Sequence, residues 1–167
     1  MPEMNFAYVS VLPILLIAAL SIPLAVIDIR EHRLPNKITY SAIIGSLFAT
    51  FVTSAATSRW LDFGAGLLAG SLTAIIGYLL ARFKVIGMGD IKLLIAMHIS
   101  LAWHAPVLIL FSLSLGLGLA TLIGLIGLVL GKIGPKNLMP LGPYLLIGFL
   151  IIGGIPVAEI ITEEALS

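Results

Sequence analysis

The chain has no cysteine and few charged residues. Asp, Glu, Lys and Arg make up 10% of its 167 residues, whereas a soluble domain carries about a quarter. Without cysteine the chain forms no disulfide, no thiolate zinc site and no cysteine nucleophile. Its three histidines, His32, His98 and His104, are scattered and lack the spacing of metal ligands. We therefore expect no metal site and no other cofactor.

Hydrocarbon side chains dominate what is present. Hydrophobic residues make up 60% of the chain and the mean hydropathy is +1.18, which predicts an integral membrane protein. The net charge of +1 provides no overall basic field for nucleic acid, so we expect no nucleic-acid partner. The first 28 residues have no basic start, and their apolar run is too long for a signal peptide. We interpret them as a retained first span.

Six apolar segments are candidates for membrane spans. A spanning helix needs about 20 mostly apolar residues, and charges, prolines and glycine clusters divide the chain into such segments. They cover residues 7–28, 38–54, 62–81, 90–104, 106–131 and 141–161. With no visible repeat, we expect an all-α, polytopic membrane helix bundle of about six transmembrane helices, forming a single domain over residues 1–167. Small residues four apart, such as Gly66 and Gly70, predict close helix packing.

The basic residues predict the orientation of the bundle. Eight of the nine lie in or beside the connections after the first, third and fifth predicted spans: Arg30, Arg33, Lys37, Arg82, Lys84, Lys92, Lys132 and Lys136. Arg59 falls on the other side. Because Lys and Arg are enriched in cytoplasmic loops, we expect these three connections in the cytoplasm and both termini outside. Trp60 and Trp103, near the outer ends of spans, are expected to be interface anchors.

Two aspartates stand out on the predicted cytoplasmic side. Asp28 ends the first span, and Asp90 begins the short fourth one. Ionisable groups at the membrane are costly and are therefore candidates for function. The third aspartate, Asp62, opens the third span on the outer side, where a helix-start role is the simpler interpretation. Glu31 lies among basic residues and is interpreted as a solvated loop charge.

Acid–base hydrolysis of a peptide bond needs at least two carboxyl groups that contact the same water molecule. One must be ionised to take a proton from water, and the other must be protonated to donate one to the carbonyl oxygen. Close approach favours that division, because like charges in a shared site of low dielectric do not both ionise cheaply. The protons then belong to the pair rather than to either residue. The start of a helix and nearby Lys92 favour the anion at Asp90, whereas Asp28 ends a helix, so we expect Asp90 to ionise more readily.

The residues before Asp90 are rich in glycine. Gly87 and Gly89 can adopt backbone conformations that other residues avoid, and they allow a substrate backbone to come close. The alternative is a loop that only needs flexibility.

Several short segments fit one family in their order along the chain. GMGDIKLL at residues 87–94 follows ID at residues 27–28 and RLPNKIT at residues 33–39, and it precedes MPLGPYL at residues 139–145. Together they resemble the type IV prepilin peptidase family of GxGD aspartic proteases, over about residues 20–150. The resemblance implies that Asp28 and Asp90 are the catalytic pair. It also implies that Gly87, Gly89 and Lys92 support Asp90 as parts of its motif. Asn36 is as suited to capping a helix as to touching substrate.

The resemblance further implies a substrate and a location. The substrate would be a pilin-like precursor whose leader is cut just before its hydrophobic N-terminal helix, in type IV pilus assembly or protein secretion. The enzyme would be a multi-pass protein of the prokaryotic inner or plasma membrane. The lipid bilayer would surround the protein, and its active site would face the cytoplasm. Residues that bind the substrate, the identity of the precursor and the oligomeric state remain open.

One departure from the family concerns the N-terminus. Many members carry an additional cytoplasmic region with paired cysteines and a methyltransferase activity, whereas here Asp28 ends the first span and cysteine is absent. The chain is therefore similar to the short, peptidase-only members that serve Flp/Tad-type pili or archaeal preflagellins. Methylation of the product would need another enzyme.

Three alternatives stay open at the level of sequence. The presenilin and signal-peptide-peptidase group shares GxGD but pairs it with Tyr-Asp and Pro-Ala-Leu motifs, where this chain has Ile27-Asp28 and Gly142-Pro143. A small transporter or channel would use Asp28 and Asp90 to relay protons or bind a cation. A non-catalytic component of a pilus assembly is the third.

Overall fold

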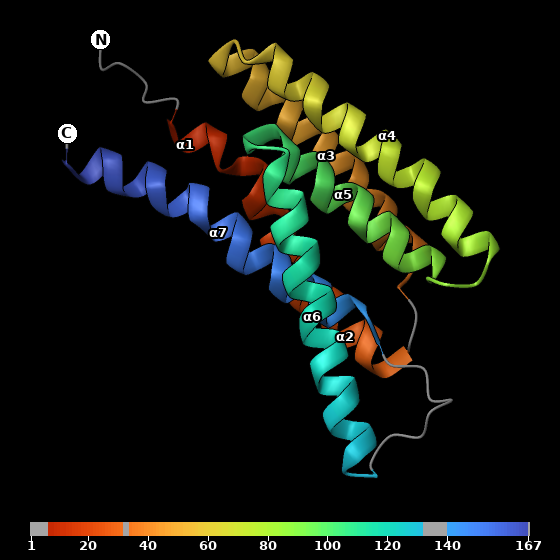
Figure 1. Ribbon diagram of the computed structural model, residues 1–167. Coiled ribbons are helices and arrows are strands. Elements are labelled where there is room, and N and C mark those ends of the chain that lie inside the picture. Colours follow the sequence, from red (N-terminus) through yellow and green to blue (C-terminus); the bar gives the residue numbers. More distant parts are fainter. Residues whose placement is uncertain (1–6, 32–33, 132–139, 167) are drawn as a thin grey trace.

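The computed structural model describes residues 7–31, 34–131 and 140–166, and all regular secondary structure within them is helical. Figure 1 shows the helices in order along the chain: α1 (Ala7–Ser10), α2 (Leu12–Glu31), α3 (Asn36–Thr57), α4 (Trp60–Arg82), α5 (Met88–His104), α6 (Val107–Val129) and α7 (Gly142–Leu166). The predicted all-α polytopic bundle is confirmed. Among the positions used in the sequence analysis, His32, Arg33, Lys132, Lys136 and Met139 lie outside the described residues.

Five of these helices are long and apolar enough to cross a membrane, namely α2, α3, α4, α6 and α7. They match the predicted spans to within a few residues, except that the first predicted span is divided at Val11 into α1 and α2. The remaining segment, α5, has 17 residues. It falls short of the about 20 residues that a lipid-exposed span needs.

Prolines set several of the helix boundaries. Pro35 comes directly before α3 and has extended backbone. Ala105 ends α5 in extended backbone, which is the conformation that the following Pro106 imposes on its neighbour. Between α3 and α4, Ser58 takes a positive φ of 58° and reverses the chain.

Helix α5 is the centre of the bundle and packs against α2, α3, α4, α6 and α7. From Ile91 to Trp103 all of its residues are buried except Lys92 and Ile95. Its closest neighbour is α4, where a Cβ added to Gly66 would lie 3.0 Å from the Ile99 carbonyl oxygen and one added to Gly70 would lie 2.7 Å from the Ile99 side chain. The small residues of α4 therefore pack as their spacing predicts. Because protein surrounds α5, its length need not match the thickness of the lipid.

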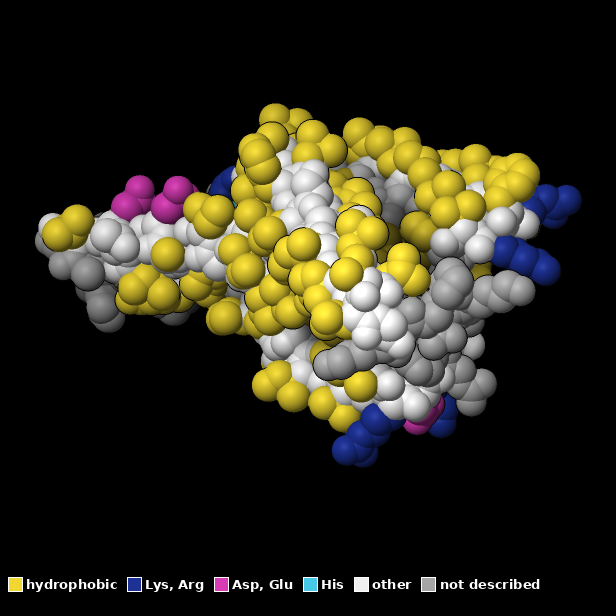
Figure 2. Space-filling view, turned by 60° about the horizontal axis from the view of Figure 1, so that its bottom comes forward, with side chains coloured by type: hydrophobic (Ala, Val, Ile, Leu, Met, Phe, Trp, Pro, Cys, Tyr) yellow, Lys and Arg dark blue, Asp and Glu magenta, His cyan; other side chains and the backbone are white. Residues whose placement is uncertain are grey.

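The outer helices present hydrocarbon to their surroundings. Ile22 of α2, Ile44 of α3 and Leu110 of α6 are 74%, 66% and 64% exposed. Figure 2 shows one face of the molecule on which hydrophobic side chains cover much of the surface, with Lys and Arg side chains at its edges. A surface of this kind fits lipid rather than water.

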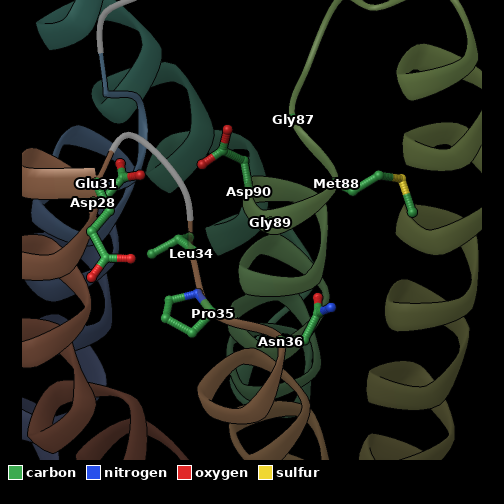
Figure 3. Close-up of a pocket in the computed structure, with 9 residues that line it drawn as sticks. All are labelled: Asp28, Glu31, Leu34, Pro35, Asn36, Gly87, Met88, Gly89 and Asp90. Atoms are coloured by element: carbon green, nitrogen blue, oxygen red, sulfur yellow. The ribbon is translucent and has the colours of Figure 1, made fainter.

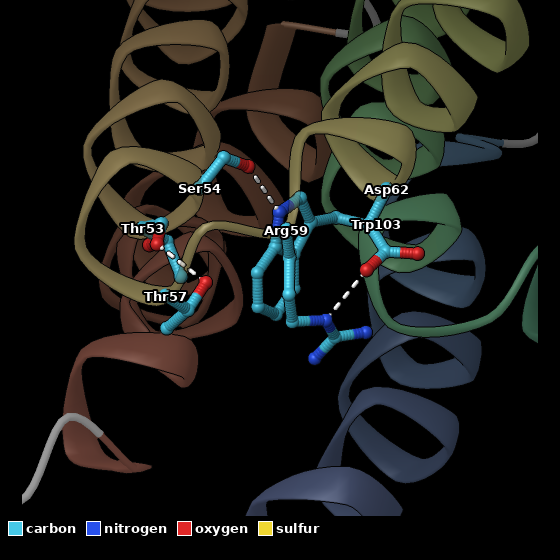
Figure 4. Close-up of polar contacts among 6 residues, drawn as sticks. All are labelled: Thr53, Ser54, Thr57, Arg59, Asp62 and Trp103. Carbon is cyan, nitrogen blue, oxygen red and sulfur yellow. Dashed lines mark hydrogen bonds and ion pairs between the residues drawn. The ribbon is translucent and has the colours of Figure 1, made fainter.

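The end of the bundle that holds α1 and the C-terminal end of α7 carries a small polar cluster (Figure 4). Trp103 Nε1 donates a 2.7 Å hydrogen bond to Ser54 Oγ, and the Arg59 guanidinium lies 4.3 Å from the centre of the Trp103 ring. Arg59 also pairs with Asp62 in the first turn of α4, as expected for a helix-start carboxylate. Trp103 is fully buried, so its predicted role as an interface anchor is wrong, whereas Trp60 is half exposed.

Candidate active site

A cavity of about 530 Å³ lies at the opposite end of the bundle, where α2 ends and α3 and α5 begin. Two segments that are far apart in the sequence line it: Asp28, Glu31, Leu34, Pro35 and Asn36 from the first, and Gly87, Met88, Gly89 and Asp90 from the second. Figure 3 shows the acidic side chains of the first segment on one side and Asp90 on the other. The two aspartates singled out from the sequence therefore share one cavity.

Asp28 lies in the last turn of α2 and is 3% exposed. Its Oδ2 accepts a 2.9 Å hydrogen bond from the backbone N–H of Gly142, the first residue of α7. The approach is so close that a Cβ added to Gly142 would lie 2.7 Å from this oxygen. The segment at residues 140–143, Pro-Leu-Gly-Pro, thus contacts Asp28 through its backbone, at the positive end of a helix.

Asp90 lies in the first turn of α5, where Gly87 is the N-cap residue. A Cβ added to Gly87 would lie 3.1 Å from Asp90 Oδ2, and one added to Gly89 would lie 3.0 Å from Leu34 Cβ. Gly87 has an ordinary φ of −70° and Gly89 lies in the helix, so neither uses the conformational freedom of glycine. Both instead allow close approach, Gly89 to the chain that follows α2.

Lys92 lies one turn from the N-terminus of α5 and contacts the start of α3. Its Nζ donates a 2.6 Å hydrogen bond to Asn36 Oδ1 and lies 4.2 Å from the centre of the Tyr40 ring. These contacts join the first turns of α5 and α3 beside the cavity. Asn36 makes this contact as the first residue of α3, and Pro35 before it provides no side-chain cap, so capping is not its role.

Sequence analysis missed two features of the cavity. Glu31 was interpreted as a loop charge, yet it is the last residue of α2 and lines the cavity beside Asp28. The signal was available, since residues three apart on a helix share a face. The Gly142 N–H carried no such signal, because a backbone contact between segments distant in the sequence leaves no trace in the spacing of side chains.

The arrangement is suited to acid–base chemistry on water. Asp28 and Asp90 face a cavity that Glu31 also lines and that is large enough for water and an extended peptide backbone. Asp28 accepts a hydrogen bond from a backbone N–H, and Asp90 lies at the N-terminus of a helix. Both features stabilise a carboxylate. Within the described residues, no three His, Asp or Glu side chains form a group that could hold a metal ion.

Comparison with known proteins gives two matches. A family model described as the type IV leader peptidase family matches residues 14–123, which include both aspartates. Leader peptidase HopD from Escherichia coli is 32% identical over 149 residues, which cover 84% of this chain and 90% of that protein. The comparison with solved structures found no significant match.

Proposed function

Because the chain belongs to the type IV leader peptidase family and is thereby a membrane-bound peptidase, we propose that it is an aspartic endopeptidase acting on pilin-like precursors. It removes the leader just before the hydrophobic N-terminal helix of the precursor. Asp28 and Asp90 activate the attacking water. The observation that carries this proposal is that these two aspartates, from distant segments of an apolar chain, line one cavity.

The reaction needs only the two carboxyl groups and water. Contrary to the expectation from sequence, we assign the ionised role to Asp28, because its Oδ2 accepts a hydrogen bond from the Gly142 N–H at the N-terminus of α7. Asp28 takes a proton from water as the water oxygen attacks the scissile carbonyl carbon, while protonated Asp90 donates its proton to the carbonyl oxygen. The tetrahedral intermediate then collapses. The C–N bond breaks, the amine takes the proton from Asp28, and the hydroxyl proton returns to Asp90.

The distribution of basic residues supports a cytoplasmic position for the cavity. Five of them lie in the helix ends and the connection at the cavity end of the bundle: Arg30, Lys37, Arg82, Lys84 and Lys92. Arg59 lies at the opposite end. An excess of Lys and Arg at one end of a membrane protein is typical of its cytoplasmic side. A precursor helix lying in the bilayer would present its cytoplasmic end at the depth of both aspartates.

Co-expression with precursors tests the proposal. A pilin-like precursor should be cut so that its new N-terminus begins the hydrophobic helix, as read by gel shift and N-terminal sequencing. The matched control is a precursor with the same helix but a scrambled leader junction, which should stay intact. If no pilin-like precursor is cut by well-inserted protein, the proposal fails, and proton or cation flux in vesicles would then test the transporter alternative.

The rate of leader removal should have an optimum in pH. At low pH both carboxyl groups are protonated and the base is lost, whereas at high pH both are ionised and the acid is lost. We expect kcat/KM of the purified protein in vesicles to rise and then fall, with each limb approaching a tenfold change per pH unit. A rate that rises steadily with pH would indicate a single base and would contradict the paired mechanism.

A further inference from the structure

A second cavity, of about 590 Å³, forms an open-sided groove on the lipid-facing surface of the bundle. Helices α4 and α6 form its walls, α5 forms its floor, and Leu141 and Leu145 at the start of α7 also line it. The groove exists because α4 packs mainly on α5 while α6 packs mainly on α7, so that the two walls diverge (Figure 1). Figure 2 shows the hydrophobic side chains on this part of the surface and a hollow between them.

The groove ends next to the candidate active site. Ile86 and Ile91 line it, and these residues directly precede Gly87 and directly follow Asp90. Leu141 also lines it and directly precedes Gly142, whose N–H binds Asp28. A chain leaving this end of the groove therefore meets the first turns of α5 and α7, the two turns that hold the aspartates in place.

The dimensions of the groove suit a helix. Its α4 wall runs from Ala65 to Leu80, which is about 22 Å at 1.5 Å per residue and most of the about 30 Å of bilayer hydrocarbon. Ala65, Ala69 and Thr73 follow one another at four-residue spacing along this wall, and small residues at that spacing let a second helix approach closely.

The chemistry of the groove suits an apolar occupant. No Asp, Glu, Lys or Arg is among the described residues that line it. Its polar groups include Thr73 and His98, and these are joined to each other by a 2.7 Å hydrogen bond between Thr73 Oγ1 and His98 Nδ1. A hydrophobic helix, whose own backbone groups are satisfied internally, fits such a surface.

We propose that this groove binds the hydrophobic N-terminal helix of the precursor and presents the leader junction to Asp28 and Asp90. The inference rests on the proposed function, since it takes its occupant from it. It adds a location for the substrate helix within the membrane. It also explains how cleavage proceeds without extracting that helix from lipid, because the groove is open on its lipid-facing side and is lined at one end by Ile86 and Ile91, which flank the Gly87–Asp90 segment of the catalytic cavity.

Cysteine cross-linking tests the groove directly, because the natural chain has no cysteine. Ile76 lines the groove, whereas its neighbour Ile75 does not, and the two side chains are 55% and 60% exposed. Ile76→Cys and Ile75→Cys are therefore matched in depth, helix and accessibility. Each is combined with Asp90→Asn so that the precursor stays uncut, and a single cysteine is moved along the hydrophobic helix of the precursor.

The expected result is disulfide formation from Ile76→Cys at precursor positions three or four residues apart, with at most about one-fifth of that yield from Ile75→Cys, corresponding to a preference of about 1 kcal/mol. Equal yields, or no yield from Ile76→Cys, would overturn the groove as the binding site and leave lipid or another chain as its occupant.

Filling the groove provides a second measurement with a different readout. Ala69→Phe on the α4 wall should raise KM for the precursor about tenfold, as a loss of about 1.4 kcal/mol of binding would, with kcat nearly unchanged. Ile75→Phe adds an aromatic side chain outside the groove and should leave KM as it is. A wild-type chain that cuts no precursor would end the proposed function itself. Normal cutting with equal KM in both variants would end only the groove.

Discussion

Asp28→Asn and Asp90→Asn should each abolish leader removal while the protein still inserts and folds. An amide has nearly the shape of a carboxyl group, yet it neither takes a proton from water nor donates one as an acid does. Because both proton transfers occur on the same water and peptide bond, we expect kcat to fall by at least about 10³-fold in each variant. Initial rates with purified protein and precursor in vesicles, read by gel shift, measure this loss.

Asp62→Asn is the matched control. Asp62 pairs with Arg59 at the far end of the bundle. The Arg59 and Asp62 side chains are 43% and 34% exposed. An exposed ion pair of this kind contributes about 0–1 kcal/mol to stability. This variant should therefore cut the precursor at nearly the wild-type rate. Equal activity in all three Asn variants would remove the assignment of the catalytic pair.

Gly142→Ala should lower kcat about 10- to 100-fold. A loss of this size is expected when a reacting group is displaced by about 1 Å. Its Cβ would lie 2.7 Å from Asp28 Oδ2 and 3.2 Å from Asp28 Cγ, so either the carboxylate or the start of α7 must move. Asp28 is buried in the last turn of α2 and has little room to retreat. KM should change less than kcat, because the added methyl group meets Asp28 and no residue that lines the groove.

Gly154→Ala on the same helix separates this effect from a general effect on α7. A Cβ at Gly154 meets nothing within 4 Å. Replacing a helical glycine with alanine favours the helix by up to about 1 kcal/mol, so this variant should keep wild-type kcat and stability or gain slightly in stability. If Gly142→Ala cuts as fast as Gly154→Ala, the hydrogen bond to Asp28 is not needed for positioning.

The features that sequence alone predicted are those with a local physical cause. Long apolar runs predict the helices because, in lipid, the backbone N–H and C=O groups must form hydrogen bonds within the segment itself. Pro35 and Pro106 mark boundaries because they restrict the residues beside them. Asp28 and Asp90 stand out because a charge is costly in an apolar chain, and the structure brings them to one cavity.

The features that sequence did not predict depend on which helices become neighbours. Trp103 was expected at the membrane interface, but its indole N–H finds Ser54 inside the bundle. Lys92 follows Asp90 by two residues, yet α3 packs where its side chain reaches Asn36 and Tyr40. Such partners come from tertiary packing and have no periodicity to detect.

The same reason explains why α5 was treated as one span among six. Its sequence shows a short apolar segment, and only the packing of α2, α3, α4, α6 and α7 around it reveals the central helix. That central position also determines the site, since the first turn of α5 carries Asp90 and its next residues form the floor of the groove.

The central claim is that Asp28 and Asp90 act as one catalytic unit, and a double-variant cycle on the rate of leader removal tests it most directly. Residues that act together on one step give losses that do not add. We predict that Asp28→Asn combined with Asp90→Asn cuts the precursor no more slowly than either single variant, within about threefold. If the two losses multiply, or if either single variant retains substantial activity, the two carboxylates do not share one reaction and the account is wrong.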